Sequence, residues 1–218
     1  LGYTQDEIIN KQLFNYVDKK FQDRAKNFFE RSKQGLKDID DSCFIKKDGS
    51  ILWVIISATP IFDDKGKFAG AIGLFTDITE HKIIRDKLIE NEEYYRTIVE
   101  FSNDMIWTLD IEGKFTFINR RSEKTSGYSL EELRGKSFCP LIVKEDLQRV
   151  IDTFHRVLSG QYQEYDVTFI NKYGKKVMLS VNTTPIYSKG KVVGTVSFGR
   201  DITQQKRIEQ KAKRITEE

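Results

Sequence analysis

Residues 126–132 read SGYSLEE, and residues 1–7 read LGYTQDE. Each stretch opens a segment that matches the other over nearly its whole length. The spacing is 125 residues and falls to 124 before the Asp-Ile-Thr found at both 77–79 and 201–203. The residues that match are mostly those that form turns and helix ends, whereas the residues between them have diverged. A segment repeated in this way predicts that one structural unit occurs twice in the chain.

The composition is that of an ordinary globular protein. Of the 218 residues, 39% are hydrophobic and 32% are charged, and the net charge of +3 is spread without a basic block. Nucleic-acid binding is therefore not expected. No apolar run approaches the roughly 18 residues that a membrane span requires, so we expect no membrane contact within this segment and a cytoplasmic location.

The residues that usually carry catalysis or bind metals are scarce. The two cysteines, Cys43 and Cys139, fall at non-equivalent positions of the repeat, which argues against a disulfide framework and for a reducing compartment. The two histidines, His81 and His155, lie far from these cysteines in the repeat, so no metal site is predicted. Phosphate-binding loops and nucleophile motifs are also absent from the sequence. We expect a regulatory segment and not an enzyme.

The second copy predicts an α+β fold. Two β-rich runs flank a turn at Gly113, Ser129 and Glu132 form a capping box, and three β-rich runs follow an amphipathic helix. An antiparallel sheet with short helices on one face accounts for this order of elements. The expected elements are strands at 105–110 and 114–119, a helix at 145–158, and strands at 165–169, 177–181 and 192–198.

Several motifs, in this order, carry a resemblance to a known family. They are Asp110-Ile111-Glu112-Gly113, then Phe117-Ile118-Asn119, the run 127–135, Gly174, Pro185 and Asp201-Ile202-Thr203. Both copies resemble a PAS domain, the first from Gly2 onward. The resemblance implies a five-stranded antiparallel sheet in each complete copy. It also implies the following organisation: a first PAS domain at 1–80 without its opening hairpin, a connecting helix at 81–98, a complete second domain at 99–203 and an outgoing coiled-coil-like helix at 204–218.

The first copy starts after the position of the opening hairpin. In the family the last strand lies beside the first, so residues 67–76 would form an open sheet edge, which is prone to pair with other strands. We therefore expect the protein to continue upstream of Leu1, or another chain to supply the missing strands.

Each copy is followed by a helix with an apolar stripe. The stripe residues recur every three or four positions, as on one face of an amphipathic helix or a coiled coil. They are Ile84, Leu88, Asn91 and Tyr95 between the copies, and Ile208, Ala212 and Ile215 in the tail. We expect a homodimer through these helices, with Asn91 able to fix the register. In the alternative interpretation, each stripe docks on its own domain.

In PAS domains the Asp-x-Thr after the last strand couples the domain to its outgoing helix. The resemblance makes six residues candidates for signal relay: Asp77, Ile78, Thr79, Asp201, Ile202 and Thr203. A short carboxylate and a hydroxyl are suited to capping the first turn of a helix. The alternative is that these residues are caps and nothing more.

The cofactors known in the family leave recognisable residues. Cys139 falls one residue late for the reactive cysteine of flavin-binding members, and His155 lies more than a turn late for a haem ligand, so neither cofactor is expected. A small organic ligand remains compatible with the sequence. The candidate pocket residues are Trp107, Phe154, His155, Tyr165, Asn182, Thr195 and Phe198. The alternative for each of them is core packing.

These features together predict a sensory module with two PAS domains in tandem. It would relay the state of a ligand or partner through the exit helices to a downstream output domain, with a histidine kinase expected and a diguanylate cyclase as the second choice. A rival interpretation is a ligand-free scaffold for dimerisation and protein–protein contacts.

Overall fold

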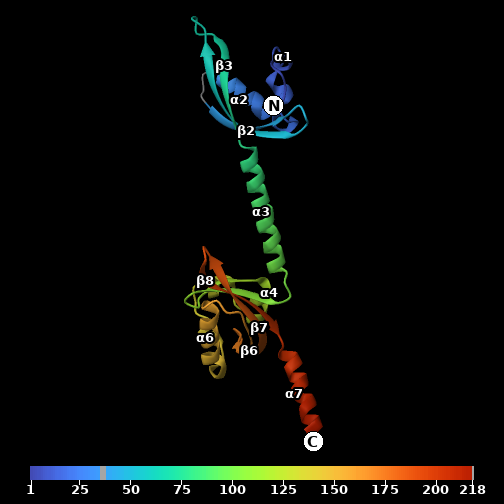
Figure 1. The fold of residues 1–218 in the computed structure, drawn as a ribbon, viewed down its shortest axis with the longest axis vertical. Coiled ribbons are helices and arrows are strands. Elements are labelled where there is room, and N and C mark those ends of the chain that lie inside the picture. The colour runs from blue at the N-terminus through green and yellow to red at the C-terminus, as the bar shows by residue number, and fades with distance from the viewer. Residues whose placement is uncertain (35–37, 218) are drawn as a thin grey trace. The chain divides into compact units, whose positions relative to one another are not determined.

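The computed structural model describes residues 1–34 and 38–217, with the side chains of Asp38 and of residues 214–217 left out. The chain divides into two compact units, Leu1–Glu92 and Glu93–Glu218. Each unit contains one antiparallel sheet and several helices (Figure 1), which confirms the predicted α+β class. None of the described helices combines the length and apolar character needed to cross a membrane.

The first unit has a three-stranded sheet in the order β1-β2-β3. Its elements are α1 (Gln5–Ile8), η1 (Leu13–Tyr16), η2 (Lys19–Phe21), α2 (Gln22–Lys33), β1 (Asp38–Ile45), β2 (Ile51–Phe62), β3 (Phe68–Asp77) and α3 (Thr79–Glu100), the last of which begins in this unit. The core forms where Val54, Ile56 and Ala58 of β2 meet Phe44 of β1 and Phe28 of α2. The three β2 residues alternate along the strand, so they share the face that the helices cover.

Strand β3 is an edge strand in the part of the chain that the structure describes. It pairs with β2 on one side, and no described strand pairs with its other side. Two of its large apolar side chains, Ile72 and Leu74, are 64% and 68% exposed. The equivalent strand of the second unit, β8, has a neighbour on each side.

The second unit has a five-stranded antiparallel sheet in the order β5-β4-β8-β7-β6. Its elements are β4 (Met105–Asp110), β5 (Phe115–Ile118), α4 (Arg120–Ser126), α5 (Leu130–Leu133), η3 (Cys139–Leu141), α6 (Lys144–Leu158), β6 (Gln163–Ile170), β7 (Lys176–Ser188), β8 (Lys191–Asp201) and α7 (Thr203–Glu217). Helix α6 packs against β6, β7 and β8 on one face of the sheet, as Figure 1 shows in yellow and orange. The predicted order of strands and helices is confirmed.

Local hydrogen bonds explain why short helices form at the same place in both units. In the second unit Glu132 N donates to Ser129 Oγ at 3.3 Å and Ser129 N donates to Glu132 Oε2 at 3.0 Å, which confirms the predicted capping box. In the first unit Thr4 N donates to Glu7 Oε2 at 2.9 Å. The helix stop is also kept, because Asn10 has a φ of 62° where the second copy has Gly135 at 74°.

The buried side chain of Asn119 joins four backbone segments of the second unit. Its Oδ1 accepts hydrogen bonds from Ile106 N at 3.0 Å and Ser122 N at 2.9 Å. Its Nδ2 donates to Val99 O at 2.9 Å and Asp104 O at 3.1 Å. The sequence indicates only that Asn119 precedes a helix. In the structure it caps α4 and also fixes the end of α3 to the start of β4.

Asn119→Ala should therefore destabilise the second unit by at least about 3 kcal/mol, because it leaves several backbone groups unpaired in a dry environment. Urea unfolding followed by NMR signals of the second unit measures the change. Asn103→Ala, at an exposed position of the adjacent turn, serves as the control and should change the free energy of unfolding little. An equally small loss for both variants would contradict this role of Asn119.

Candidate functional site

The last strand of the second unit passes into α7 through three consecutive residues that bind to the start of β7. Ile202 N donates to Met178 O at 2.9 Å. Thr203 Oγ1 accepts from Met178 N at 2.9 Å, and Asp201 Oδ1 accepts from Thr203 N at 2.9 Å. We call this arrangement, made by residues 201–203 and Met178, the strand–helix junction of the second unit.

The first unit has the same junction, made by residues 77–79 and Trp53 of β2. Ile78 N donates to Trp53 O at 2.9 Å, Thr79 Oγ1 accepts from Trp53 N at 2.9 Å, and Asp77 Oδ1 accepts from Thr79 N at 2.8 Å. The six candidate relay residues therefore lie together in two groups of three, each group with the same set of partners.

The junction joins the first turn of α7 to the hydrogen-bond network of the sheet. Leu179 and Asp201 form the last regular pair between β7 and β8, and the threonine hydroxyl then takes the place of a backbone acceptor for Met178 N. The first α7 hydrogen bond, from Lys206 N to Ile202 O, starts at the same residue that is bonded to β7. The start of α7 is therefore joined to the start of β7 by two hydrogen bonds.

In the first junction the electrostatics of the aspartate follow from its hydrogen bonds. The backbone N–H of Thr79 is the main cause that lowers the pKa of the Asp77 carboxyl from its usual 3.8, and the hydroxyl of Thr79 acts in the same direction. The charged carboxylate also lies at the N-terminus of α3, where the helix dipole favours negative charge.

The stripe residues of the exit helices are largely exposed within the described units. Ile84, Leu88, Tyr95 and Ile208 are 58%, 66%, 64% and 60% exposed, and Asn91 and Ala212 are exposed as well. The side chain of Ile215 lies outside the described part of the chain. The described stripe residues are therefore not packed into the core of either unit.

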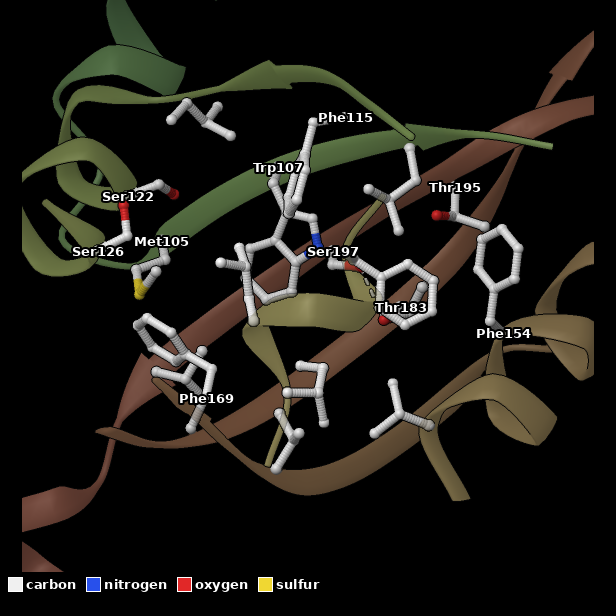
Figure 2. Close-up of a pocket in the computed structure, with 18 of the residues that line it drawn as sticks. Met105, Trp107, Phe115, Ser122, Ser126, Phe154, Phe169, Thr183, Thr195 and Ser197 are labelled. Carbon is white, nitrogen blue, oxygen red and sulfur yellow. Dashed lines mark hydrogen bonds between the residues drawn. The ribbon is translucent and has the colours of Figure 1, made fainter. Parts of the chain in front are cut away.

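The second unit also encloses a cavity of about 90 Å³ between the inner face of its sheet and the helices (Figure 2). Of the seven candidate pocket residues, Trp107, Phe154, Tyr165 and Thr195 line this cavity. Their side chains come from β4, α6, β6 and β8, so the cavity brings together segments that are far apart in the sequence.

The other three candidates lie elsewhere, which corrects the expected pocket. Asn182 and Phe198 pair across β7 and β8 and lie on the outer face of the sheet, where Phe198 is 42% exposed. Side chains alternate between the faces of a strand, so Phe198 cannot share a face with Thr195. His155 follows Phe154 on α6 and is exposed, because one residue along a helix turns the side chain away from the core.

Sequence reasoning missed most of the polar groups in the cavity. Thr183 and Ser197 line it, with a distance of 2.9 Å between their hydroxyl oxygens. Their side chains lie on the same face of the sheet as buried neighbours such as Val181. The alternation of side chains along a strand was the signal that could have identified them. Thr195 is fully buried, and its Oγ1 has no hydrogen-bond partner in the described part of the chain.

The described residues that line the cavity include no charged side chain. Burial raises the pKa of the Tyr165 phenol, against the opposite effect of its hydrogen bond with Thr183, so this group remains neutral. Among the described residues, no group of three His, Cys, Asp or Glu side chains is placed to hold a metal ion. Cys43 is buried, and burial raises the pKa of its thiol, whereas Cys139 is partly exposed in η3.

The cavity wall reaches the junction through neighbouring residues. Leu179 lines the cavity and directly follows Met178, whose backbone is bonded to Thr203. Gly199 allows Trp107 to pack closely, since a Cβ on this residue would lie 2.7 Å from Trp107 Cζ3 and 3.2 Å from Leu179 Cδ1. Trp107 and Leu179 therefore connect the cavity to the sheet end from which α7 leaves.

Both halves of the chain match models of known protein families. A family model described as "PAS fold" matches residues 99–207, and one described as "PAS domain" matches residues 1–80. Phytochrome B of Sorghum bicolor is 27% identical over 90% of this chain and 18% of its own length. Biofilm dispersion protein BdlA of Pseudomonas aeruginosa is 24% identical over 95% of this chain and 50% of its own length. The chain thus spans half or less of these two relatives.

Among solved structures, a PAS domain of a protein from Colwellia psychrerythraea is similar to part of this chain. It is 24% identical with a TM-score of 0.49, and the match covers 51% of this chain and 97% of that one.

Loss of the junction hydroxyl should weaken the second unit. Thr203→Val keeps the shape of the side chain but leaves Met178 N without its acceptor, so we expect a loss of about 1–2 kcal/mol. Urea unfolding followed by NMR signals of the second unit is the measurement. Gln204→Ala, at the next and exposed position, is the control. No difference between the two variants would show that the Thr203 hydroxyl contributes nothing.

The Asp77 carboxylate should make stability depend on acid pH. Because its folded pKa lies below the usual 3.8, its contribution is complete above that pH and is lost as the pH falls through the folded pKa. Asp77→Asn should be less stable than the parent at neutral pH, and the difference should shrink below pH 3.8. Thermal unfolding across this range, with exposed Asp64→Asn as the charge control, tests it. A difference that stays constant with pH would contradict the assignment.

Proposed function

The chain belongs to the PAS family, and on that premise we propose that it is a sensory, signal-transducing module of two PAS domains in tandem. In this proposal the second unit senses a small ligand in its cavity and passes its state through α7, and the first unit uses α3 in the same way. The observation that carries the proposal is the strand–helix junction, which occurs twice with the same three hydrogen bonds.

The proposed signal begins as a change in the packing of the cavity wall. A ligand that displaces Trp107 or Leu179 moves the residues next to the junction, and the bond from Met178 N to Thr203 Oγ1 transfers this movement to α7. A coupling free energy of about 1–3 kcal/mol changes the output several-fold to about a hundredfold. The two hydrogen bonds between the Met178 backbone and the start of α7 are together worth a free energy in this range.

We further propose that this regulatory segment acts on an output domain in the same protein, a histidine kinase in the first place and a diguanylate cyclase as the alternative. The protein would be cytoplasmic and would act as a homodimer through α3 and α7. The exposed apolar residues Ile84, Leu88, Tyr95 and Ile208 support this pairing, because burying them against a second copy removes apolar surface from water.

The same exposed stripe also favours a second function, a ligand-free scaffold for dimerisation and protein contacts. In a scaffold the cavity is a packing defect, and nothing that enters it changes the exit helix. The two functions therefore differ in whether the cavity and α7 are coupled.

Xenon is a suitable probe of this coupling, since it enters apolar cavities without needing hydrogen bonds. In the purified chain under xenon pressure, backbone amide signals should shift around the cavity and also in the first turn of α7, at residues 204–208. In Thr203→Val the cavity signals should shift as before, while the α7 shifts should fall by at least about half, because the hydroxyl link is gone. Gln204→Ala should behave like the parent. Cavity shifts without α7 shifts in the parent would contradict the relay and leave the scaffold.

A further inference from the structure

The buried hydroxyl of Thr195 is the unexplained polar group of the cavity. It is fully buried, lines the cavity and has no hydrogen-bond partner among the residues that the structure describes. Leaving a hydroxyl unpaired in an apolar interior is destabilising, so such groups call for a partner. Figure 2 shows the Thr195 oxygen directed toward the middle of the cavity, away from the ring of Phe154.

The surroundings leave Thr195 available to a ligand. Ser197 lies two residues further along β8 on the same face, and its hydroxyl is already paired with that of Thr183. The Thr183–Ser197 contact occupies those two hydroxyls with each other, so Thr195 is the group at this end of the cavity that lacks a partner among the described residues. The site therefore suits a molecule that places one polar atom against Thr195 and is otherwise apolar.

The rest of the wall sets the charge and size of the occupant. Apart from Thr195 and the indole N–H of Trp107, the described lining groups are apolar or already hydrogen-bonded, and no charged side chain is among them, so an ion would lose its hydration without compensation. The volume of about 90 Å³ compares with an engineered cavity of about 150 Å³ that holds benzene. A molecule of about four or five non-hydrogen atoms fits this space.

We propose that the cavity of the second unit binds a small, uncharged aliphatic molecule with a single hydroxyl or carbonyl oxygen. That oxygen hydrogen-bonds to Thr195 Oγ1, and the alkyl part packs against Phe154 and Trp107. The inference rests on the proposed sensory function and assigns the chemical class of its ligand. Trp107 lies against Gly199 near Leu179, so it is the wall residue that links this site toward the junction.

The test compares n-butanol, which carries one hydroxyl, with xenon, which carries none. Amide signals of the cavity residues are followed by NMR as each probe is titrated into the parent chain. We expect saturable n-butanol binding in the parent and a loss of affinity of about tenfold in Thr195→Val, since one hydrogen bond is removed. Xenon binding should change by less than about twofold, because Thr195→Val keeps the shape of the wall.

Two further variants separate the hydroxyl from the fold. Thr195→Ser keeps the hydroxyl and should bind n-butanol within about threefold of the parent. Thr184→Val, at the neighbour of Thr183 that does not line the cavity, should leave both affinities unchanged. Without ligand, Thr195→Val should be at least as stable as the parent, because an unpaired buried hydroxyl is removed.

The outcomes distinguish this inference from the function on which it rests. Equal n-butanol affinity in the parent and Thr195→Val overturns the role of Thr195. Entry of xenon without any n-butanol binding overturns the ligand class but leaves the relay intact, as long as α7 responds to xenon. Exclusion of both probes overturns the ligand class and the sensory role of this cavity together.

Discussion

A threonine hydroxyl at the first position of each exit helix accepts a hydrogen bond from the backbone of a central strand, and this bond joins the helix to the sheet of its own unit. The hydroxyls of Thr203 and Thr79 accept from backbone N–H groups that a further residue pair of the sheet would otherwise have to satisfy. The helix therefore begins inside the hydrogen-bond network of the sheet. Its first turn cannot rotate or shift unless the strand follows or the bond breaks, which is the mechanical requirement for passing a conformational state from one to the other.

The two copies show which parts of the junction need a particular residue. Aspartate, isoleucine and threonine occur in both, whereas the receiving residue is Trp53 in one unit and Met178 in the other. This difference has a physical reason, since the receiving strand contributes only its backbone N–H and C=O. A side chain at that position can therefore differ between the units, and that of Trp53 makes an edge-to-face contact with Phe21 and lies under the ammonium group of Lys82.

Much of the fold could be predicted because it is determined by short-range signals. The capping pair at Ser129 and Glu132 and the left-handed stop at Asn10 need only neighbouring residues, and so do the alternating strands. The cavity could be predicted only in part. Four of the predicted residues line it: Trp107, Phe154, Tyr165 and Thr195. Asn182 and Phe198 lie on the other face of the sheet. Consistent use of the alternation along each strand would have replaced these two by Thr183 and Ser197. The role of Asn119 could not be predicted, because its partners lie up to 20 residues away.

The central claim is that the start of α7 and the start of β7 open as one unit. Site-resolved amide hydrogen exchange of Met178 and Lys206 measures this directly, since the Met178 amide bonds to Thr203 and the Lys206 amide begins the helix. The account predicts the same opening free energy for both amides, and a fall in both when Thr203 is replaced by valine. A Lys206 amide that exchanges as in a free helix while Met178 stays protected, or a Thr203→Val protein in which only one of the two changes, would contradict it.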